Sequence, residues 1–225
     1  MEPLILSVRG THPQIPESTF LAPNCTVVGD VTMGEGCSIW FNAVVRGDVN
    51  FIRLGDEVNI QDGAVIHGTY QKHGTTIGNQ VSIGHGATVH GCTLHDRVLV
   101  GMGAIVMDRC VVESGSIIAA GAVLTEGTHV PAGSVFAGVP AKKVKDITPE
   151  LMAGEVEQPV DKVPENLTSE RLTVFGRLAG GHGGADHDLA VVERDHIGGA
   201  FDVHESAVDF VTGLVIDQCH LQGRE

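Results

Sequence analysis

The chain of 225 residues carries a formal net charge of −14, and only 4% of its residues are aromatic. An acidic chain without a basic stripe argues against nucleic acid as a partner. No apolar run of about eighteen residues and no basic-then-apolar leader is found, which argues against a membrane span and a secretory signal. Five cysteines, an odd number without Cys-x-x-Cys spacing, favour reduced thiols and a cytoplasmic protein.

A step of six residues links aliphatic positions along most of the first 130 residues, and a small or β-branched residue stands two positions before each of them. A helix or a hairpin sheet has no such period, whereas a parallel β-helix, built of short flat sides and tight corners, does. The aliphatic positions are Val27, Met33, Ile39, Val45, Leu54, Ile60, Ile66, Ile77, Ile83, Val89, Leu94, Val100, Val106, Val112, Ile118, Leu124 and Val130. The small positions are Cys25, Val31, Cys37, Ala43, Val58, Ala64, Thr75, Val81, Ala87, Cys92, Val98, Ala104, Cys110, Ser116, Ala122 and Thr128.

Three such hexads make one triangular coil, and successive coils stack about 4.8 Å apart, so residues eighteen apart lie one above another. We expect this domain to span residues 1–147, with coils over about 18–140. Cysteines at the small positions should behave as compact apolar residues. Glycines directly after an aliphatic residue should provide turns with positive φ. These glycines are Gly34, Gly55, Gly78, Gly84 and Gly101.

Three interruptions of the step predict local irregularities. The interval from Ile66 to Ile77 is five residues too long, so residues 68–74 (GTYQKHG) should form a loop outside a corner. The interval after Val45 is also long, which predicts an irregular coil around Asp48. The interval after Val89 is one residue short and predicts a tightened corner.

Histidines occupy defined places in this repeat. Without the five extra residues of the loop, His67 and His90 are eighteen residues apart, and each directly follows an aliphatic residue. They should therefore share one corner on adjacent coils, close enough to bind one metal ion. His85 lies one side of the triangle away, up to ~16 Å along an extended chain. It reaches the same ion only from another subunit, so the register predicts an oligomer.

Three stretches then resemble the γ-class carbonic anhydrase family, from about Ile15 to Ile147: VVRGDVNFIRLGDEVNIQDGAVIHG, TTIGNQVSIGHGATVHGCTLHDRVLVGMGAIV and IIAAGAVL. The resemblance implies a left-handed β-helix, although crossover connections are otherwise almost always right-handed. It also implies a homotrimer that binds zinc or ferrous iron and hydrates carbon dioxide to bicarbonate. In that family two histidines of one subunit and one of its neighbour hold the metal, which here would be His67, His90 and the neighbour's His85.

Further residues acquire roles through the same resemblance. Three imidazoles leave a catalytic zinc an open position for water, whose pKa falls to about 7. Gln61 matches the family residue that orients the nucleophile. Arg46, Asp48 and Asp62 resemble the charged group at the family's subunit interface, where a guanidinium can grip carboxylates. A plain ion pair is an equally good interpretation of Arg46 and Asp62. Asn59 is expected in the same pocket.

Two departures keep other functions open. Val49 stands where the family's prototypes carry glutamate, and the loop at 68–74 has no carboxylate. His73 is the group of this loop that titrates near neutral pH, so it is either a proton acceptor or a solvated histidine, with Tyr70 as another proton route. A metal-binding homologue with little turnover therefore remains an alternative. So does an acyltransferase or thioester hydrolase acting on a coenzyme A-type substrate, because one fold hosts several activities.

The resemblance ends after the β-helix. Thr148 and Pro149 offer an N-cap and a first helical position, so a short helix is expected from there. Pro159 and Pro164 limit its length. We expect residues 148–225 to contain this helix and an acidic, Gly-rich tail. The basic run Lys142, Lys143 and Lys145 just before it is expected to be a solvated edge.

Overall fold

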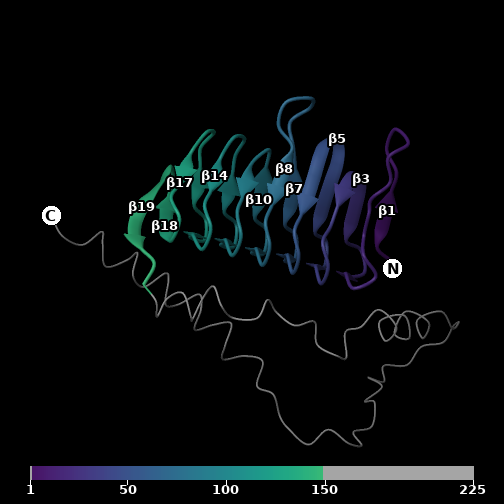
Figure 1. Ribbon diagram of the computed structural model, residues 1–225, viewed down its shortest axis with the longest axis horizontal. Helices are drawn as coiled ribbons and strands as arrows, with labels where there is room; N and C mark the ends of the chain where they lie inside the picture. The colour runs from purple at the N-terminus through teal and green to yellow at the C-terminus, as the bar shows by residue number, and fades with distance from the viewer. Residues whose placement is uncertain (1, 149–225) are drawn as a thin grey trace, which may run out of the picture. The chain divides into compact units, whose positions relative to one another are not determined.

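The computed structural model describes residues 2–148, and this part of the chain contains nineteen short strands and no helix. Strands of successive coils pair in parallel, one above another. Figure 1 shows the coils stacked along one axis, from β1 at one end to β19 at the other. The fold is the expected all-β parallel β-helix and is consistent with left-handed winding.

Each regular coil contributes one strand to each of three faces. The first face carries β1 (Leu4–Leu6), β3 (Thr26–Thr32), β5 (Val44–Leu54), β7 (Val65–His67), β10 (Thr88–His90), β13 (Ile105–Val106) and β16 (Val123–Leu124). The second face carries β8 (Thr75–Ile77), β11 (Thr93–Leu94), β14 (Val111–Val112) and β17 (His129–Val130). The third face carries β2 (Phe20–Leu21), β4 (Ser38–Ile39), β6 (Asn59–Ile60), β9 (Ser82–Ile83), β12 (Leu99–Val100), β15 (Ile117–Ile118), β18 (Ser134–Gly138) and β19 (Ala141–Asp146).

The aliphatic positions of the repeat fill the interior, as predicted. Leu94 pairs with Val112 and Val112 with Val130, so residues eighteen apart are stacked. Every aliphatic position is at most 6% exposed, and all belong to one core cluster. Full burial of each such side chain stabilises the fold by about 1.5–3 kcal/mol before the entropy of ordering is subtracted. The core is therefore a narrow aliphatic column, which explains the small aromatic content.

Two predicted irregularities lie at the same corner, where β7 leads into β8. Residues 68–74 form a loop that projects beyond the corner (Figure 1) and is closed by an antiparallel bridge between Thr69 and His73. The coil before it contains the eleven-residue β5, which pairs with β7 through Val45 and with β8 through Leu54. β5 thus runs along two faces and carries Asp48 past the corner between them.

The expectation for the five glycines that follow an aliphatic residue is wrong. None of the five has a positive φ; the turns take positive φ two residues later, at glycines such as Gly86 and at Glu57. Glycine is needed at these positions because the backbone of the next coil approaches too closely to leave space for a side chain. A Cβ at Gly84 would lie 2.7 Å from the backbone nitrogen of Met102, and one at Gly101 would lie 2.5 Å from that of Ala120.

Four cysteines are buried and unpaired at the small positions: Cys25, Cys37, Cys92 and Cys110. Burial raises the pKa of the Cys25 thiol to about 11 and raises the pKa of the other three thiols as well. A protonated buried thiol is a poor nucleophile. These cysteines therefore act as compact core residues, as expected.

The last coil ends at an antiparallel strand. β19 pairs with β18, and from Lys142 to Asp146 its residues are exposed. Lysines on an edge strand discourage further strand pairing, so the basic run is the solvated edge that the sequence predicts. The helix expected from Thr148 and the tail beyond it lie outside the described residues. In residues 2–148, no helix is long and apolar enough to cross a membrane.

Candidate metal centre

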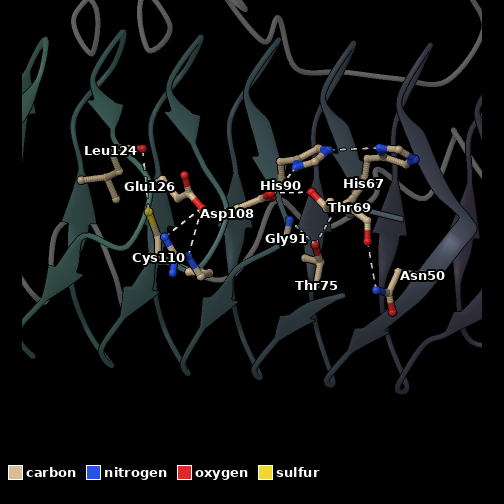
Figure 2. Close-up of polar contacts among 11 residues, drawn as sticks. Asn50, His67, Thr69, Thr75, His90, Gly91, Asp108, Cys110, Leu124 and Glu126 are labelled. Carbon is tan, nitrogen blue, oxygen red and sulfur yellow. Dashed lines mark hydrogen bonds and ion pairs between the residues drawn. The ribbon is translucent and has the colours of Figure 1, made fainter. Parts of the chain in front are cut away.

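Strands β7 and β10 both end in a histidine, and the two histidines are paired in register. Nδ1 of His67 lies 3.1 Å from Nε2 of His90, and the ring centroids are 5.1 Å apart. Figure 2 shows the two imidazoles facing each other above their strands. The register thus predicts this arrangement correctly, because both histidines hold the same place on adjacent coils. Their role as metal ligands stays a prediction.

Each imidazole also contacts a carboxylate on its far side. Nε2 of His67 lies 3.0 Å from Oδ1 of Asp48, and Nδ1 of His90 lies 2.6 Å from Oδ1 of Asp108. Arg46 donates a hydrogen bond of 2.6 Å to the second oxygen of Asp48. β5 carries Arg46 and Asp48, whereas Asp108 follows β13 in the next coil. Four successive coils therefore build one row of four side chains.

The electrostatics of this row favour charged carboxylates and a neutral His67. Burial raises the pKa of the Asp48 carboxyl, but hydrogen bonds from His67 and Arg46 outweigh it and hold that pKa below its ordinary value. Burial also raises the pKa of Asp108, and hydrogen bonds to its two oxygens lower it by more. Burial lowers the pKa of the His67 imidazole, although Asp48 opposes this shift. A neutral imidazole is the form that binds metal.

The row lacks one proton. It has three polar contacts, between Asp48 and His67, between the two histidines, and between His90 and Asp108, but two neutral imidazoles supply only two N–H groups. A cation between the imidazoles would compensate for the missing proton. Tetrahedral zinc with nitrogen bonds of about 2.0–2.1 Å places its ligand atoms about 3.3 Å apart, close to the observed 3.1 Å. The residues therefore fit a divalent metal.

Within one chain, residues 2–148 contain no group of three or more His, Cys, Asp or Glu side chains able to hold a metal ion. His85 follows β9 and precedes β10, whereas His90 ends β10, so the whole of β10 lies between them. The His85 side chain is 55% exposed, and its Nδ1 lies 3.0 Å from Oδ2 of Asp62. Its corner is therefore separate from that of His67 and His90.

The remaining predicted site residues divide between these two corners and the third face. Arg46 and Asp48 lie together beside His67, whereas Asp62 pairs with His85 instead. Gln61 directly follows β6 and precedes Asp62, so it belongs to the His85 corner. Within one chain, the expected charged group thus forms two separate parts.

Asn59 is buried on the third face, within β6. Its side-chain oxygen accepts hydrogen bonds from the Ser38 hydroxyl at 3.0 Å and from the Trp40 indole nitrogen at 2.8 Å. These contacts connect neighbouring coils and give Asn59 a structural role. No contact places it against the paired histidines, so its expected place in the pocket stays a prediction.

The loop at 68–74 carries the two candidate proton-transfer groups. His73 is half-buried, and a Cβ built on Gly91 would lie 3.1 Å from its own Cβ, so it lies close to the residue after His90. Tyr70 is 52% exposed, with the guanidinium of Arg9 stacked 5.7 Å from its ring centroid. His73 thus lies beside the corner of the paired histidines, and proton transfer by His73 or Tyr70 stays a prediction.

Two residues of this corner were not identified from the sequence. Asp108 contacts His90, and the buried Thr75 hydroxyl donates to the carbonyl of His67 and accepts from the backbone N–H of Gly91 at 3.0 Å. Thr75 counted only as a small residue of the repeat. Asp108 lies one coil beyond Gly91 in the same register, which is the signal that could have identified it.

Comparisons with known proteins identify relatives of this chain. A model of the bacterial transferase hexapeptide family (six repeats) matches residues 12–47 and 91–126. A probable carbonic anhydrase of Methanocaldococcus jannaschii is 52% identical over 136 residues, which are 60% of this chain and 85% of that protein. The mitochondrial gamma carbonic anhydrase 1 of Arabidopsis thaliana is 40% identical over 199 residues, 86% of this chain and 68% of that protein.

A solved structure also aligns with the β-helix. The hexapeptide transferase family protein from Anaplasma phagocytophilum is 42% identical, with a TM-score of 0.64, and the match covers 67% of this chain and 89% of that one. The repeat, the corner histidines and the identity to named carbonic anhydrases over most of their length lead to one assignment. The chain belongs to the γ-class carbonic anhydrase family.

Proposed function

We propose that this protein is a metal-dependent carbonic anhydrase that hydrates carbon dioxide to bicarbonate. The observation that carries the proposal is the pair of imidazoles 3.1 Å apart, each in contact with a carboxylate on its far side. Carboxylates behind ligating imidazoles fix the tautomer and orientation of the ring. When bound, a zinc or ferrous ion would make water acidic enough to lose a proton near neutral pH.

The third imidazole of the site comes from a second copy of the chain. His85 is exposed at its corner, and Asp62 at 3.0 Å can fix its tautomer so that the other ring nitrogen is available. A ring in which each copy offers its His85 corner to the His67 corner of the next completes every site. The family resemblance implies three copies, and a homotrimer is part of this proposal.

Other residues near the two corners can orient the substrates, neutralise charge and transfer the proton. Gln61, beside Asp62, can orient the attacking water and the carbon dioxide through its amide. Arg46 neutralises the charge of Asp48 and so keeps the pocket accessible to bicarbonate. His73 can accept the proton released by water and pass it to buffer, because an imidazole nitrogen can both take up and release a proton.

One observation favours a second candidate. The exposed pair of His85 and Asp62 resembles a general base with an orienting carboxylate, as acyl transfer to a hydroxyl or amine needs. The similar Anaplasma phagocytophilum structure is named a hexapeptide transferase family protein. However, this reading leaves the mutual contact of His67 and His90 without a function, so we rank it second.

Metal analysis and a hydration assay on the same preparation separate these functions. The full-length chain is purified without oxygen, its zinc and iron are measured, and carbon dioxide hydration is followed by stopped flow. One metal per chain with hydration supports the proposal. Metal without hydration would indicate a binding homologue with little turnover, in line with Val49 and the carboxylate-free loop. Absence of metal together with thioester cleavage on acetyl coenzyme A would favour acyl transfer and overturn the proposal.

A further inference from the structure

The structure assigns Asp108 as a positioning residue that sets the tautomer of His90 and joins this ligand to the loop at 68–74. This inference rests on the proposed metal site. The Asp108 side chain is 20% exposed and directs its carboxylate along the prism toward His90 and Thr69, as Figure 2 shows. One oxygen lies 2.6 Å from Nδ1 of His90, and the other accepts a hydrogen bond from the Thr69 hydroxyl.

The contact with His90 determines which ring nitrogen is free. A carboxylate only accepts hydrogen bonds, so the proton of neutral His90 is held at Nδ1. Its Nε2 then keeps a lone pair, and this is the atom that faces His67 at 3.1 Å. Without Asp108 the proton could move to Nε2 and block the atom that a metal needs. Asp108 therefore prepares His90 as a ligand before any metal arrives.

The backbone leaves room for this carboxylate. The corner after His90 is one residue short and contains Gly91, with a φ of +54°. A Cβ at Gly91 would lie 2.1 Å from Oδ1 of Asp108, so any other residue would displace the carboxylate. Asp108 follows Gly91 by one coil, which is one residue shorter than the regular eighteen. The glycine and the aspartate therefore depend on each other, because only glycine leaves space for the carboxylate. The next coil carries Glu126 in the register of Asp108, but Glu126 pairs with Arg109 instead.

The second oxygen connects the same carboxylate to the loop. Thr69 is the first residue of the bridge that closes the loop, since its N–H donates to the carbonyl of His73 at 2.8 Å. The Asn50 amide holds the Thr69 carbonyl at 3.1 Å from the other side. The base of the loop is thereby fixed to the carboxylate that orients His90. Asp108 consequently positions both a ligand and the segment that carries His73.

The test compares Asp108→Ala with Glu126→Ala in the full-length chain. The two variants remove an acidic side chain from the same register position of neighbouring coils, and circular dichroism checks folding. Zinc affinity is measured by competition with a chromophoric chelator at pH 8. We expect Asp108→Ala to weaken zinc binding roughly 10- to 100-fold, whereas Glu126→Ala changes it less than about twofold. Asp108→Asn, which preserves volume, replaces Asp108→Ala if that variant does not fold.

A second readout does not depend on metal. In the metal-free protein labelled with ¹⁵N-histidine, the His90 signals, assigned with His90→Gln, should show the Nδ1–H tautomer. Asp108→Ala should shift His90 toward the Nε2–H form. Thr69→Val should leave the tautomer unchanged, while the backbone amide of His73, which donates to the carbonyl of residue 69 at 3.3 Å, exchanges faster with solvent. Equal zinc affinity in the two alanine variants, with an unchanged tautomer, would overturn this inference alone. A parent protein that binds no zinc would overturn the proposed function as well.

Discussion

The two histidine corners of this molecule lie at opposite ends of β10 and differ in how they are built. At one corner His67 and His90 are 16% and 34% exposed, contact each other and have a carboxylate on each side. At the other corner His85 is 55% exposed and has Asp62 as its carboxylate partner. The first corner is assembled within a single chain, whereas the second is presented outward.

This difference follows from the register of the coils. Strand pairing stacks residues of equal register at a spacing of about 4.8 Å, which suits two ligands of one ion. The turn before β10 and the end of β10 cannot be brought together in the same way, because the strand between them is extended. A three-histidine site on this fold therefore needs two copies, each supplying a different corner.

The largest effect is expected on the hydration rate, from removal of the loop histidine beside the corner of His67 and His90. His73→Ala is expected to lower the maximal hydration rate in dilute buffer by up to about 100-fold, because the released proton loses its acceptor. Added imidazole should restore part of the rate, and the metal content should not change. Lys72→Ala, an exposed neighbour in the loop, serves as the control. An unchanged rate would show that His73 is a solvated histidine, and loss of metal would show that the loop supports the ligands directly.

A smaller effect is expected at the backbone of the same corner. Thr75→Val removes the buried hydroxyl that bonds both the His67 carbonyl and the Gly91 N–H. The direct hydrogen bond of 3.1 Å between these two backbone groups remains, so the loss should be about 1 kcal/mol in the free energy of unfolding. Thr128→Val is the matched control, because Thr128 holds the same place in the repeat but bonds Thr125 within its own turn. Its cost should stay within about 0.5 kcal/mol. Urea denaturation of the metal-free proteins measures both values, and equal losses would show that Thr75 contributes nothing specific to the ligand corner.

The smallest effect is expected far from both corners. Truncation after Glu157 should leave the circular dichroism spectrum and the metal content unchanged. β19 already covers the edge of the last coil with Lys142 and Lys143, and both histidine corners lie before it. An unfolded or metal-free product would show that residues beyond 157 stabilise the β-helix.

Much of this architecture was predictable because the hexad register converts sequence spacing into position. It located His67 above His90, placed the loop at 68–74 and separated His85 from both. The role of the glycines was misjudged because the period shows where a turn lies but not how closely the next coil approaches it. Gly84 is an example, since backbone nitrogen rather than positive φ excludes a side chain there.

The contacts of the paired histidines were harder to predict than the pairing itself. Asp108 reaches back to His90 across one coil, and Thr75 turns its hydroxyl toward two backbone groups. Register specifies the height and face of a residue but not the direction in which its side chain leans. Contacts of this kind depend on the shortened corner at Gly91, whose consequence for Asp108 becomes visible only in three dimensions.

The most direct test of the account is complementation between subunits. His67→Ala and His85→Ala chains, each with a different affinity tag, are unfolded together, refolded and purified through both tags. Each variant alone should bind no metal at the proposed site. Mixed oligomers should recover some metal, because one interface can combine the intact His67 corner of one chain with the intact His85 of the other. Mixed oligomers that form but bind no metal would contradict a site shared between subunits.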